Sequence, residues 1–148
     1  GSGKAISIPV DMRIMAIAFI PSDSGEVATK KARALLPETI PHIDAAVNIS
    51  RSTLMVEALA RKPELLFAGT EDRIHQFYRQ SQMPKSYALM STLRDAGVPA
   101  FISGSGPTVL ALHYGSAADA QEIARAGADS FTSQIVGVSA QGAHIFNG

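Results

Sequence analysis

The sequence predicts an α+β domain, with a mostly antiparallel sheet of about four strands and helices covering one face. Three observations predict this fold. An apolar segment at 14–20 has the composition of an interior strand, two β-forming segments flank a glycine-rich loop, and the remaining segments carry helix start and stop signals. A chain of 148 residues is long enough for one domain with a single core.

The expected elements follow the order β, several α, β-loop-β, α, β-β. They are a strand within Val10–Ile20, helices over Thr29–Leu36 and Pro41–Arg61, a helical turn over Glu64–Phe67, a helix over Ser86–Ala96, strands Val98–Ile102 and Thr108–His113, a helix from Ser116 to Ala126, and strands Ser133–Ala140 and Ala143–Phe146.

Local signals justify the elements of the first half. The first strand is rich in Ile, Met and Phe, is apolar on both faces from Ile14, and is closed by turn residues. Thr29 is a good N-cap for the short helix, and Pro37 stops it. The long helix opens at Thr39 and Pro41 and carries apolar residues around much of its circumference, so we expect it to be buried.

The second half has the clearer stop signals. Leu89 and Leu93 align on one side of the next helix, which Gly97 and then Pro99 end. Ser116 caps the alanine-rich helix that follows. A Gln-Gly turn at 141–142 predicts a terminal hairpin.

Composition excludes several classes of protein. The 13 basic and 13 acidic residues cancel, so the chain offers no net positive charge to nucleic acid or to an anionic membrane. No apolar segment reaches the roughly 18 residues of a membrane helix. The chain has no cysteine and its four histidines are far apart, which excludes thiolate and local zinc sites and fits a reducing compartment. We therefore expect a cytoplasmic protein with no metal ligands of its own.

The loop between the two central strands is the most informative segment. Gly104 and Gly106 can adopt positive φ, so that backbone N–H groups converge on a phosphate or carboxylate. The alternative is a hairpin that only reverses the chain. Strands on both sides argue against a Walker or dinucleotide site, which needs a helix N-terminus behind the glycines.

Three segments resemble motifs of one enzyme family. Residues 102–109, ISGSGPTV, resemble the third conserved motif of the GHMP kinases, named for galactokinase, homoserine kinase, mevalonate kinase and phosphomevalonate kinase. Residues 28–37, ATKKARALLP, resemble the T-x-x-A-R-x-x-L-P segment of homoserine kinases, and residues 71–79, EDRIHQFYR, resemble their D-x-x-H-x-P-x-R segment. Residues 141–145 resemble the terminal strand of the family, and Phe77 stands where the family has proline.

The resemblance covers almost all of the chain after Gly1-Ser2-Gly3, which reads as a cloning scar. It implies that residues 4–148 are the C-terminal domain of a GHMP kinase, with a ferredoxin-like fold and a helical insertion. The implied activity is transfer of the γ-phosphoryl group of ATP to the hydroxyl of L-homoserine in threonine biosynthesis. The family binds ATP through a P-x-x-x-G-L-G-S-S-A segment of its N-terminal domain, which this sequence lacks.

The missing segment sets the expected cofactors and partners. ATP and Mg²⁺ are expected in the complete enzyme, bound mainly by the N-terminal kinase domain, and this fragment alone is expected to be inactive. The expected partners are L-homoserine and that N-terminal domain, with neither nucleic acid nor membrane. Whether two copies of the chain form a homodimer stays open.

The chemistry of a small amino acid selects the candidate site residues. A carboxylate is best oriented by a planar guanidinium with two parallel hydrogen bonds, and the resemblance assigns this role to Arg33 and Arg79. Thr29 shares a helix face with Arg33, one turn away. On spacing alone these two would be an ordinary N-cap and a solvated arginine. The expected phosphate or substrate loop consists of Ser103, Gly104, Ser105 and Gly106.

Other polar residues of the 71–79 segment keep a structural interpretation. Glu71 and Asp72 can serve as a base or in ion pairs, although paired acids at a helix start usually interact with the helix dipole. His75 is expected at a helix end or in the core, close to the site. No catalytic residue is predicted in this chain.

Two other functions compete with a kinase domain. An α+β domain can bind an amino acid as a regulatory module without catalysis, although the long helical insertion that carries both arginines argues against it. The chain can also be a scaffold domain, in which case the long helix would expose a large apolar patch in the monomer. Within the family, a GHMP kinase with another acceptor is the alternative.

Overall fold

The computed structural model describes residues 7–23 and 29–139, and the side chains of Thr29, Lys30 and Lys31 lie outside the description. The expected turn at 141–142 and strand at 143–146 also lie outside it. The elements in chain order are β1 (Ile14–Pro21), α1 (Thr29–Ala34), α2 (His42–Ala60), the 3₁₀-helix η1 (Pro63–Leu65), α3 (Leu66–Gly69), α4 (Gln76–Arg79), the 3₁₀-helix η2 (Gln80–Gln82), α5 (Pro84–Asp95), β2 (Ala100–Ile102), β3 (Val109–Tyr114), α6 (Ala117–Arg125) and β4 (Phe131–Gly137).

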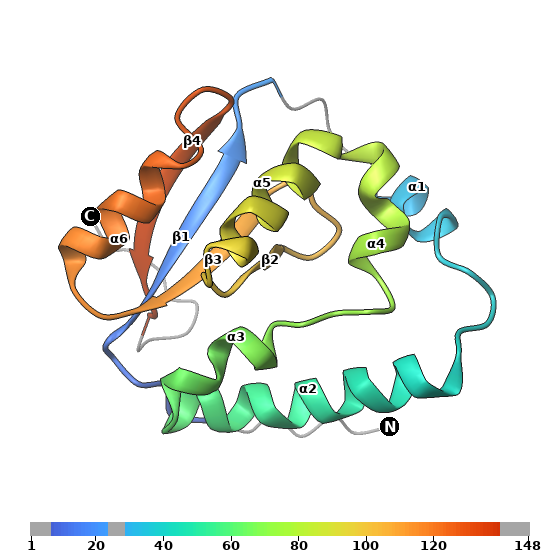
Figure 1. Cartoon of the computed structure of the whole chain (residues 1–148), viewed down its shortest axis with the longest axis horizontal. Helices are drawn as coiled ribbons and strands as arrows, with labels where there is room; N and C mark the ends of the chain where they lie inside the picture. Colours follow the sequence, from blue (N-terminus) through green and yellow to red (C-terminus); the bar gives the residue numbers. More distant parts are fainter. Residues whose placement is uncertain (1–6, 24–28, 140–148) are drawn as a thin grey trace, which may run out of the picture.

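The described strands form one sheet in the order β2-β3-β1-β4, and neighbouring strands are antiparallel (Figure 1). Central strand β1 pairs Ala18 with Leu110 of β3 and with Gln134 of β4. Since β2 pairs with β3, the glycine loop joins two neighbouring strands. The predicted fold class, an antiparallel four-stranded α+β domain, is confirmed.

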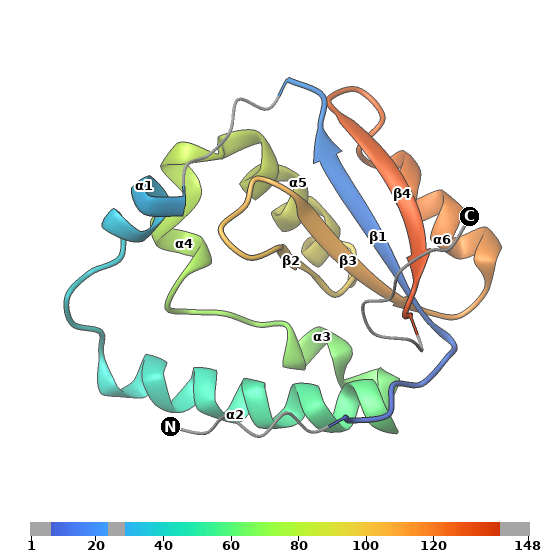
Figure 2. The same ribbon diagram turned by 180° about the vertical axis from the view of Figure 1, so that it is seen from behind.

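The main hydrophobic core lies between one face of the sheet and the pair α5 and α6. Side chains alternate between the faces of a strand, so Ile17 and Phe19 point to this core together with Val109, and each has no exposed surface. Leu93 of α5 and Ala120 of α6 pack against them. In Figure 2 the strands lie in front of these two helices.

A second, smaller core lies on the opposite face of the sheet. Ile14 and Leu112 point to this side and pack against Ala58 of α2 and Leu66 of α3. The N–H of Asp11, just before β1, donates to the carbonyl of Leu59 at 2.8 Å. The end of α2 is thereby fixed to the sheet.

The expectation that the long helix is buried is wrong. Among the described residues of α2 only Ala58 is buried, while Ile43, Ile49 and Val56 are 64%, 68% and 46% exposed. The physical reason is that only the C-terminal end of α2 packs against the sheet, whereas the helix runs on past it (Figure 1). The pattern of apolar residues around a helix does not indicate which of them will pack against another element.

Several element boundaries differ from the prediction by about two residues. Helix α5 begins at Pro84 rather than Ser86, because proline suits the first helical turn, where its missing N–H is not needed. It ends as expected before Gly97, which has φ +81°. Ser116 caps α6 through a hydrogen bond from the N–H of Asp119, 3.2 Å long. Helix α4 was not predicted as a separate helix.

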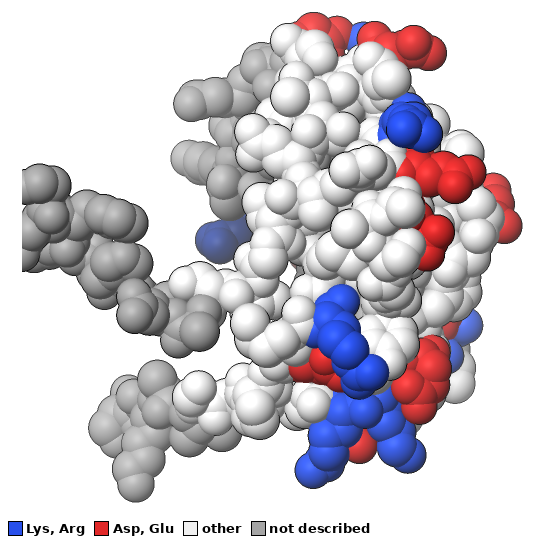
Figure 3. Space-filling model, turned by 90° about the vertical axis from the view of Figure 1, so that its left-hand side faces the viewer, with Lys and Arg blue, Asp and Glu red and all other residues white. Residues whose placement is uncertain are grey.

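The described surface mixes both signs of charge. Figure 3 shows the side of the molecule near α6, where basic and acidic groups lie next to one another. Ion pairs such as Arg13–Asp11 and Arg61–Glu57 contribute to this pattern, with N–O distances of 2.6 and 2.5 Å. Within residues 7–23 and 29–139, no helix has the length and apolar character that crossing a bilayer requires.

Candidate functional site

The glycine loop between β2 and β3 is tightly folded. Gly104 and Gly106 have φ of +59° and +82°, a region that side-chain-bearing residues rarely adopt. The N–H of Ser103 donates to the carbonyl of Thr108, and the N–H of Gly106 donates to the carbonyl of Ser103, both at 2.9 Å. The predicted positive φ values are confirmed. Because the Gly106 amide is used within the loop, an anion can be held only by other amides of it.

Two residues at the start of α5, Met83 and Ser86, pack against the loop. A Cβ atom at Gly106 would lie 2.6 Å from the sulfur of Met83 and 3.1 Å from Ile102. The hydroxyl of Ser86 donates to the carbonyl of Pro107 at 2.6 Å. A side chain at Gly106 would therefore have to displace the buried side chain of Met83.

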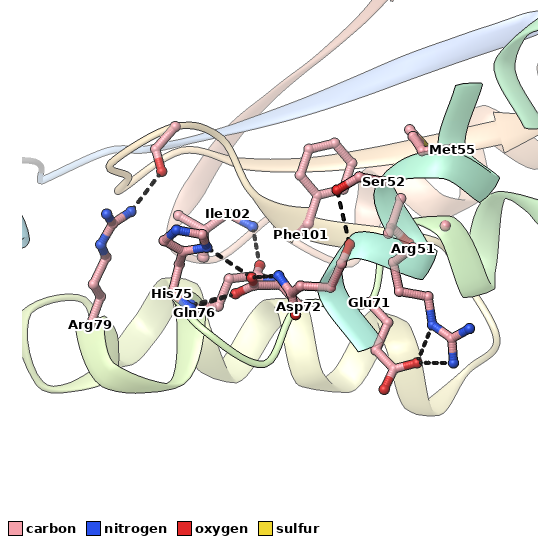
Figure 4. A pocket seen from close by; sticks show the side chains of 14 residues that line it. Arg51, Ser52, Met55, Glu71, Asp72, His75, Gln76, Arg79, Phe101 and Ile102 are labelled. Atoms are coloured by element: carbon pink, nitrogen blue, oxygen red, sulfur yellow. Dashed lines mark hydrogen bonds and ion pairs between the residues drawn. The ribbon is translucent and has the colours of Figure 1, made fainter. Parts of the chain in front are cut away.

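A cleft of about 420 Å³ opens beside this loop (Figure 4). Its walls come from α2, from α4 and the segment before it, from the end of β2 and from the glycine loop. The lining residues are Asn48, Arg51, Ser52, Met55, Gly69, Thr70, Glu71, Asp72, His75, Gln76, Arg79, Phe101, Ile102 and Gly104. The predicted placement of the loop at the edge of a cleft is confirmed through Gly104.

Arg79 lies at the loop end of the cleft. Its Nη1 donates to the carbonyl of Gly104 at 3.0 Å, and its buried Nε has no hydrogen-bond partner among the described residues. A guanidinium has five N–H donors and no acceptor. Nε is buried away from the cleft, but Nη1 has only one bond, to Gly104, so the Nη groups of Arg79 keep donors for a further acceptor, such as a carboxylate, next to the loop.

Asp72 organises the start of α4. Its Oδ2 accepts hydrogen bonds from the N–H groups of His75 and Gln76 at 2.9 and 2.7 Å, and its Oδ1 accepts one from the Asn48 amide at 2.7 Å. The ring Nδ1 of His75 lies 2.9 Å from the same Oδ1. Both oxygens are occupied, so Asp72 acts as a helix-capping acceptor and is not free to serve as a base.

The charge state of Asp72 follows from these bonds. Burial acts to raise the pKa of Asp72, but the hydrogen bonds from Gln76, Asn48 and His75 together lower that pKa below its ordinary value. The carboxylate therefore stays ionised, and the interpretation that the acids at this helix start interact with the helix terminus fits Asp72.

The other end of the cleft carries an ion-pair network. Glu71 accepts from Arg51 Nε at 2.9 Å and from Arg73 Nε at 3.0 Å. Burial acts to raise the pKa of Glu71, but these two arginines lower it overall. As Figure 4 shows, the Arg51–Glu71 pair and Arg79 lie at opposite ends, with Asp72 and the neighbouring α4 residues between them.

The structure brings together only part of the predicted site. Arg79 and Gly104 line the cleft and contact each other, and Gly106 and Ser105 lie in the same loop. Arg33 lies exposed on α1 and is not among the residues that line the cleft. The side chain of Thr29 lies outside the description.

Sequence reasoning missed the contribution of α2 and of one α4 side chain. Asn48 uses both ends of its amide, donating to the carboxylate of Asp72 and accepting from the backbone N–H of Arg73 at 2.9 Å. Gln76 accepts from the N–H of Ile102 at 2.6 Å. Asn48 lies among apolar residues of the expected helix, and this was the one sequence signal that it has a structural partner. No local pattern marked Gln76 as a residue of the site.

Replacing the capping carboxylate gives a pH-dependent prediction. Asp72→Asn should lower the free energy of unfolding by about 1–2 kcal/mol at pH 7, because an amide replaces one of the acceptor oxygens. The folded-state pKa of Asp72 is lowered, so its contribution is present above its unfolded pKa and is lost as the pH falls below about 4. Urea unfolding at pH 7 and pH 3 measures this difference.

The control for this experiment is exposed Asp129→Asn on the turn before β4, which should change the free energy of unfolding by less than about 0.5 kcal/mol. A stability difference between wild type and Asp72→Asn that is equally large at both pH values would contradict the capping role of the carboxylate.

Comparisons with known proteins agree on one family. Residues 55–132 match the family model described as GHMP kinases C terminal. A protein named homoserine kinase from Streptomyces avermitilis is 45% identical over 145 residues, and one from Streptomyces coelicolor is 47% identical. Each alignment covers 98% of this chain and 46% of the relative, so the chain spans just under half the length of these curated relatives.

A solved structure extends the similarity to the fold. The crystal structure of homoserine kinase from Cytophaga hutchinsonii is similar to this chain with a TM-score of 0.72 and 26% sequence identity. The similarity covers 90% of this chain and 44% of the other.

Proposed function

Because the chain belongs to the GHMP kinase C-terminal family, we propose that it is the acceptor-side domain of an ATP-dependent homoserine kinase. The complete enzyme would transfer the γ-phosphoryl group of ATP to the hydroxyl of L-homoserine, a step of threonine biosynthesis. The two relatives whose alignments cover 98% of this chain are both named homoserine kinase. Their names support homoserine as the acceptor over other acceptors in the family.

The placement of Arg79 carries the proposal. A small amino acid offers a carboxylate, an amine and a hydroxyl, and the hydroxyl must stay free to attack phosphorus. Arg79 projects from α4 into the cleft beside Gly104, with donors to spare. A guanidinium there can bind the carboxylate with two parallel hydrogen bonds and so orient the hydroxyl.

Thr29 and Arg33 of α1 complete the proposed substrate site. Arg33 is exposed and would reach the carboxylate from a second direction once the N-terminal domain closes on the cleft. The loop would contribute backbone N–H groups, with Ser103 and Ser105 as further donors at its surface. No residue of this chain is assigned the role of a catalytic base.

The nucleotide and its metal are assigned to the other half of the enzyme. In residues 7–23 and 29–139 no group of three acidic, histidine or cysteine side chains is placed to hold a metal ion, and the sequence has no P-x-x-x-G-L-G-S-S-A segment. The N-terminal kinase domain is the proposed partner, in the cytoplasm.

The experiment that tests this function replaces the carboxylate-binding groups. Arg79→Lys in the complete enzyme should lower kcat/KM for homoserine. The expected loss of transition-state stabilisation is about 1.5–3 kcal/mol, because lysine keeps the charge but loses the planar pair of donors. Arg33→Lys should act in the same direction. Steady-state kinetics with homoserine and ATP varied separately should show little change in the KM for ATP.

The matched control is Arg125→Lys, an exposed arginine in the last turn of α6, which should leave both substrates unaffected. A thermal melt excludes misfolding. Near-normal homoserine kinetics in both Arg79→Lys and Arg33→Lys, or a loss confined to ATP, would show that these arginines do not bind the carboxylate.

A further inference from the structure

The glycine loop begins at the open edge of the sheet. Strand β2 is the edge strand and pairs only with β3 among the described strands. The N–H of Ser103 is bonded to Thr108, just before β3, and the carbonyl of Pro99 accepts from the N–H of Leu112 in β3. In an antiparallel pair the alternate residues turn their backbone polar groups outward, so Ala100 and Ile102 present theirs at the open edge, where they need partners.

Two side chains supply partners for two of these groups. Gln76 Oε1 accepts from the N–H of Ile102 at 2.6 Å, and Arg94 Nη1 donates to the carbonyl of Ala100 at 3.1 Å. Ile102 is buried, so its N–H has little access to water. Figure 4 shows the bond between Gln76 and Ile102 at the side of the cleft.

Gln76 is itself held in place. Its own N–H donates to Asp72 Oδ2 at 2.7 Å, and Asp72 is bonded to Asn48 of α2. Arg79 follows Gln76 by three residues, which places both on the same side of α4. Arg79 donates to the carbonyl of Gly104. Helix α4 is therefore bonded to the chain at Ile102, just before the loop, and at Gly104, within the loop.

We propose that Gln76 is a positioning residue that fixes the glycine loop against α4 through the N–H of Ile102. The loop backbone and Arg79 are thereby kept in one arrangement at the end of the cleft. Gln76 does not itself touch the reacting atoms. Its effect on catalysis rests on the proposed function, whereas its hold on the loop does not.

Amide hydrogen exchange tests the hold on the loop. Gln76→Leu removes the acceptor, and Gln76→Glu keeps an acceptor oxygen at about the same position. In this 148-residue chain, Gln76→Leu should speed exchange of the Ile102 amide at least about tenfold, and Gln76→Glu should leave it within about threefold of wild type. Gln121→Leu, at an exposed position of α6, is the matched control and should leave that amide unchanged.

Kinetics of the complete enzyme test the consequence for the site. Gln76→Leu should lower kcat/KM for homoserine about tenfold with the KM for ATP unchanged. Exchange of the Ile102 amide at the wild-type rate in Gln76→Leu overturns the proposal, as does faster exchange with unchanged homoserine kinetics. If the wild-type complete enzyme does not phosphorylate homoserine, the proposed function fails, and the exchange rates still decide whether Gln76 holds the loop.

Discussion

The 148-residue chain by itself is expected to release no measurable ADP from ATP in the presence of L-homoserine. Phosphoryl transfer depends on positioning of the nucleotide and on neutralising its charge. The sequence has no P-x-x-x-G-L-G-S-S-A segment, and among the described residues no group of three acidic, histidine or cysteine side chains is placed to hold a metal ion. Since removal of a single charge-stabilising donor costs about 10²–10³ in rate, loss of the entire nucleotide site should reduce turnover by at least about 10³.

The measurement joins this chain to the N-terminal half of a relative such as the Streptomyces coelicolor homoserine kinase, 47% identical to the chain over 145 residues. ADP release is followed for the chain, for the N-terminal half and for the fusion, with formation of the phosphorylated amino acid checked in each. Turnover should appear only in the fusion. Turnover by the 148-residue chain alone would refute the assignment of the nucleotide site to the other half.

Gly106→Val is expected to be the most damaging single substitution in the loop. Valine at a φ of +82° is strained by about 1–3 kcal/mol, and its Cβ would lie 2.6 Å from the Met83 sulfur. The collision adds an overpacking cost of about 1–3 kcal/mol. We expect the free energy of unfolding to fall by about 2–6 kcal/mol, and kcat/KM of the complete enzyme to fall at least about 10²-fold.

Substitutions at two other glycines distinguish the effect of backbone strain from that of the steric collision and from a direct effect on activity. Gly97 and Gly104 also have positive φ, at +81° and +59°, but a Cβ would meet nothing within 4 Å at either. Gly97→Val should therefore lower stability by the strain alone and leave activity unchanged. Gly104→Val should lose activity as well, because Gly104 lines the cleft.

The hydroxyl of the loop provides the remaining comparison. Ser105→Ala in the complete enzyme should cost much less activity than either loop glycine substitution, because the loop is proposed to act through its backbone. Chemical unfolding and steady-state kinetics are measured on each variant. Should Ser105→Ala prove the more damaging change at unchanged stability, the hydroxyl rather than the backbone would carry the function.

Several features of the site were predicted from the sequence because their signals are local. Glycines that need positive φ are recognisable in the sequence, as at Gly104 and Gly106. The alternating and apolar patterns of β1 and β3 determine that they form strands. Arg79 was selected by the resemblance and by carboxylate chemistry, and the structure places it in the cleft.

The sequence by itself thus determined the antiparallel α+β fold, the glycine loop between two strands and the family, since these depend on short patterns of residue type. Tertiary structure alone decided that α2 packs against the sheet only at its C-terminal end. It also decided that Asn48 bonds to residues 72 and 73 and that Gln76 and Arg94 bond to the backbone of β2. Asn48 and Gln76 each bind a partner 24 to 26 positions away in the chain. Such contacts arise from how helices pack on a sheet edge and not from local conformational preference, so no local pattern records them.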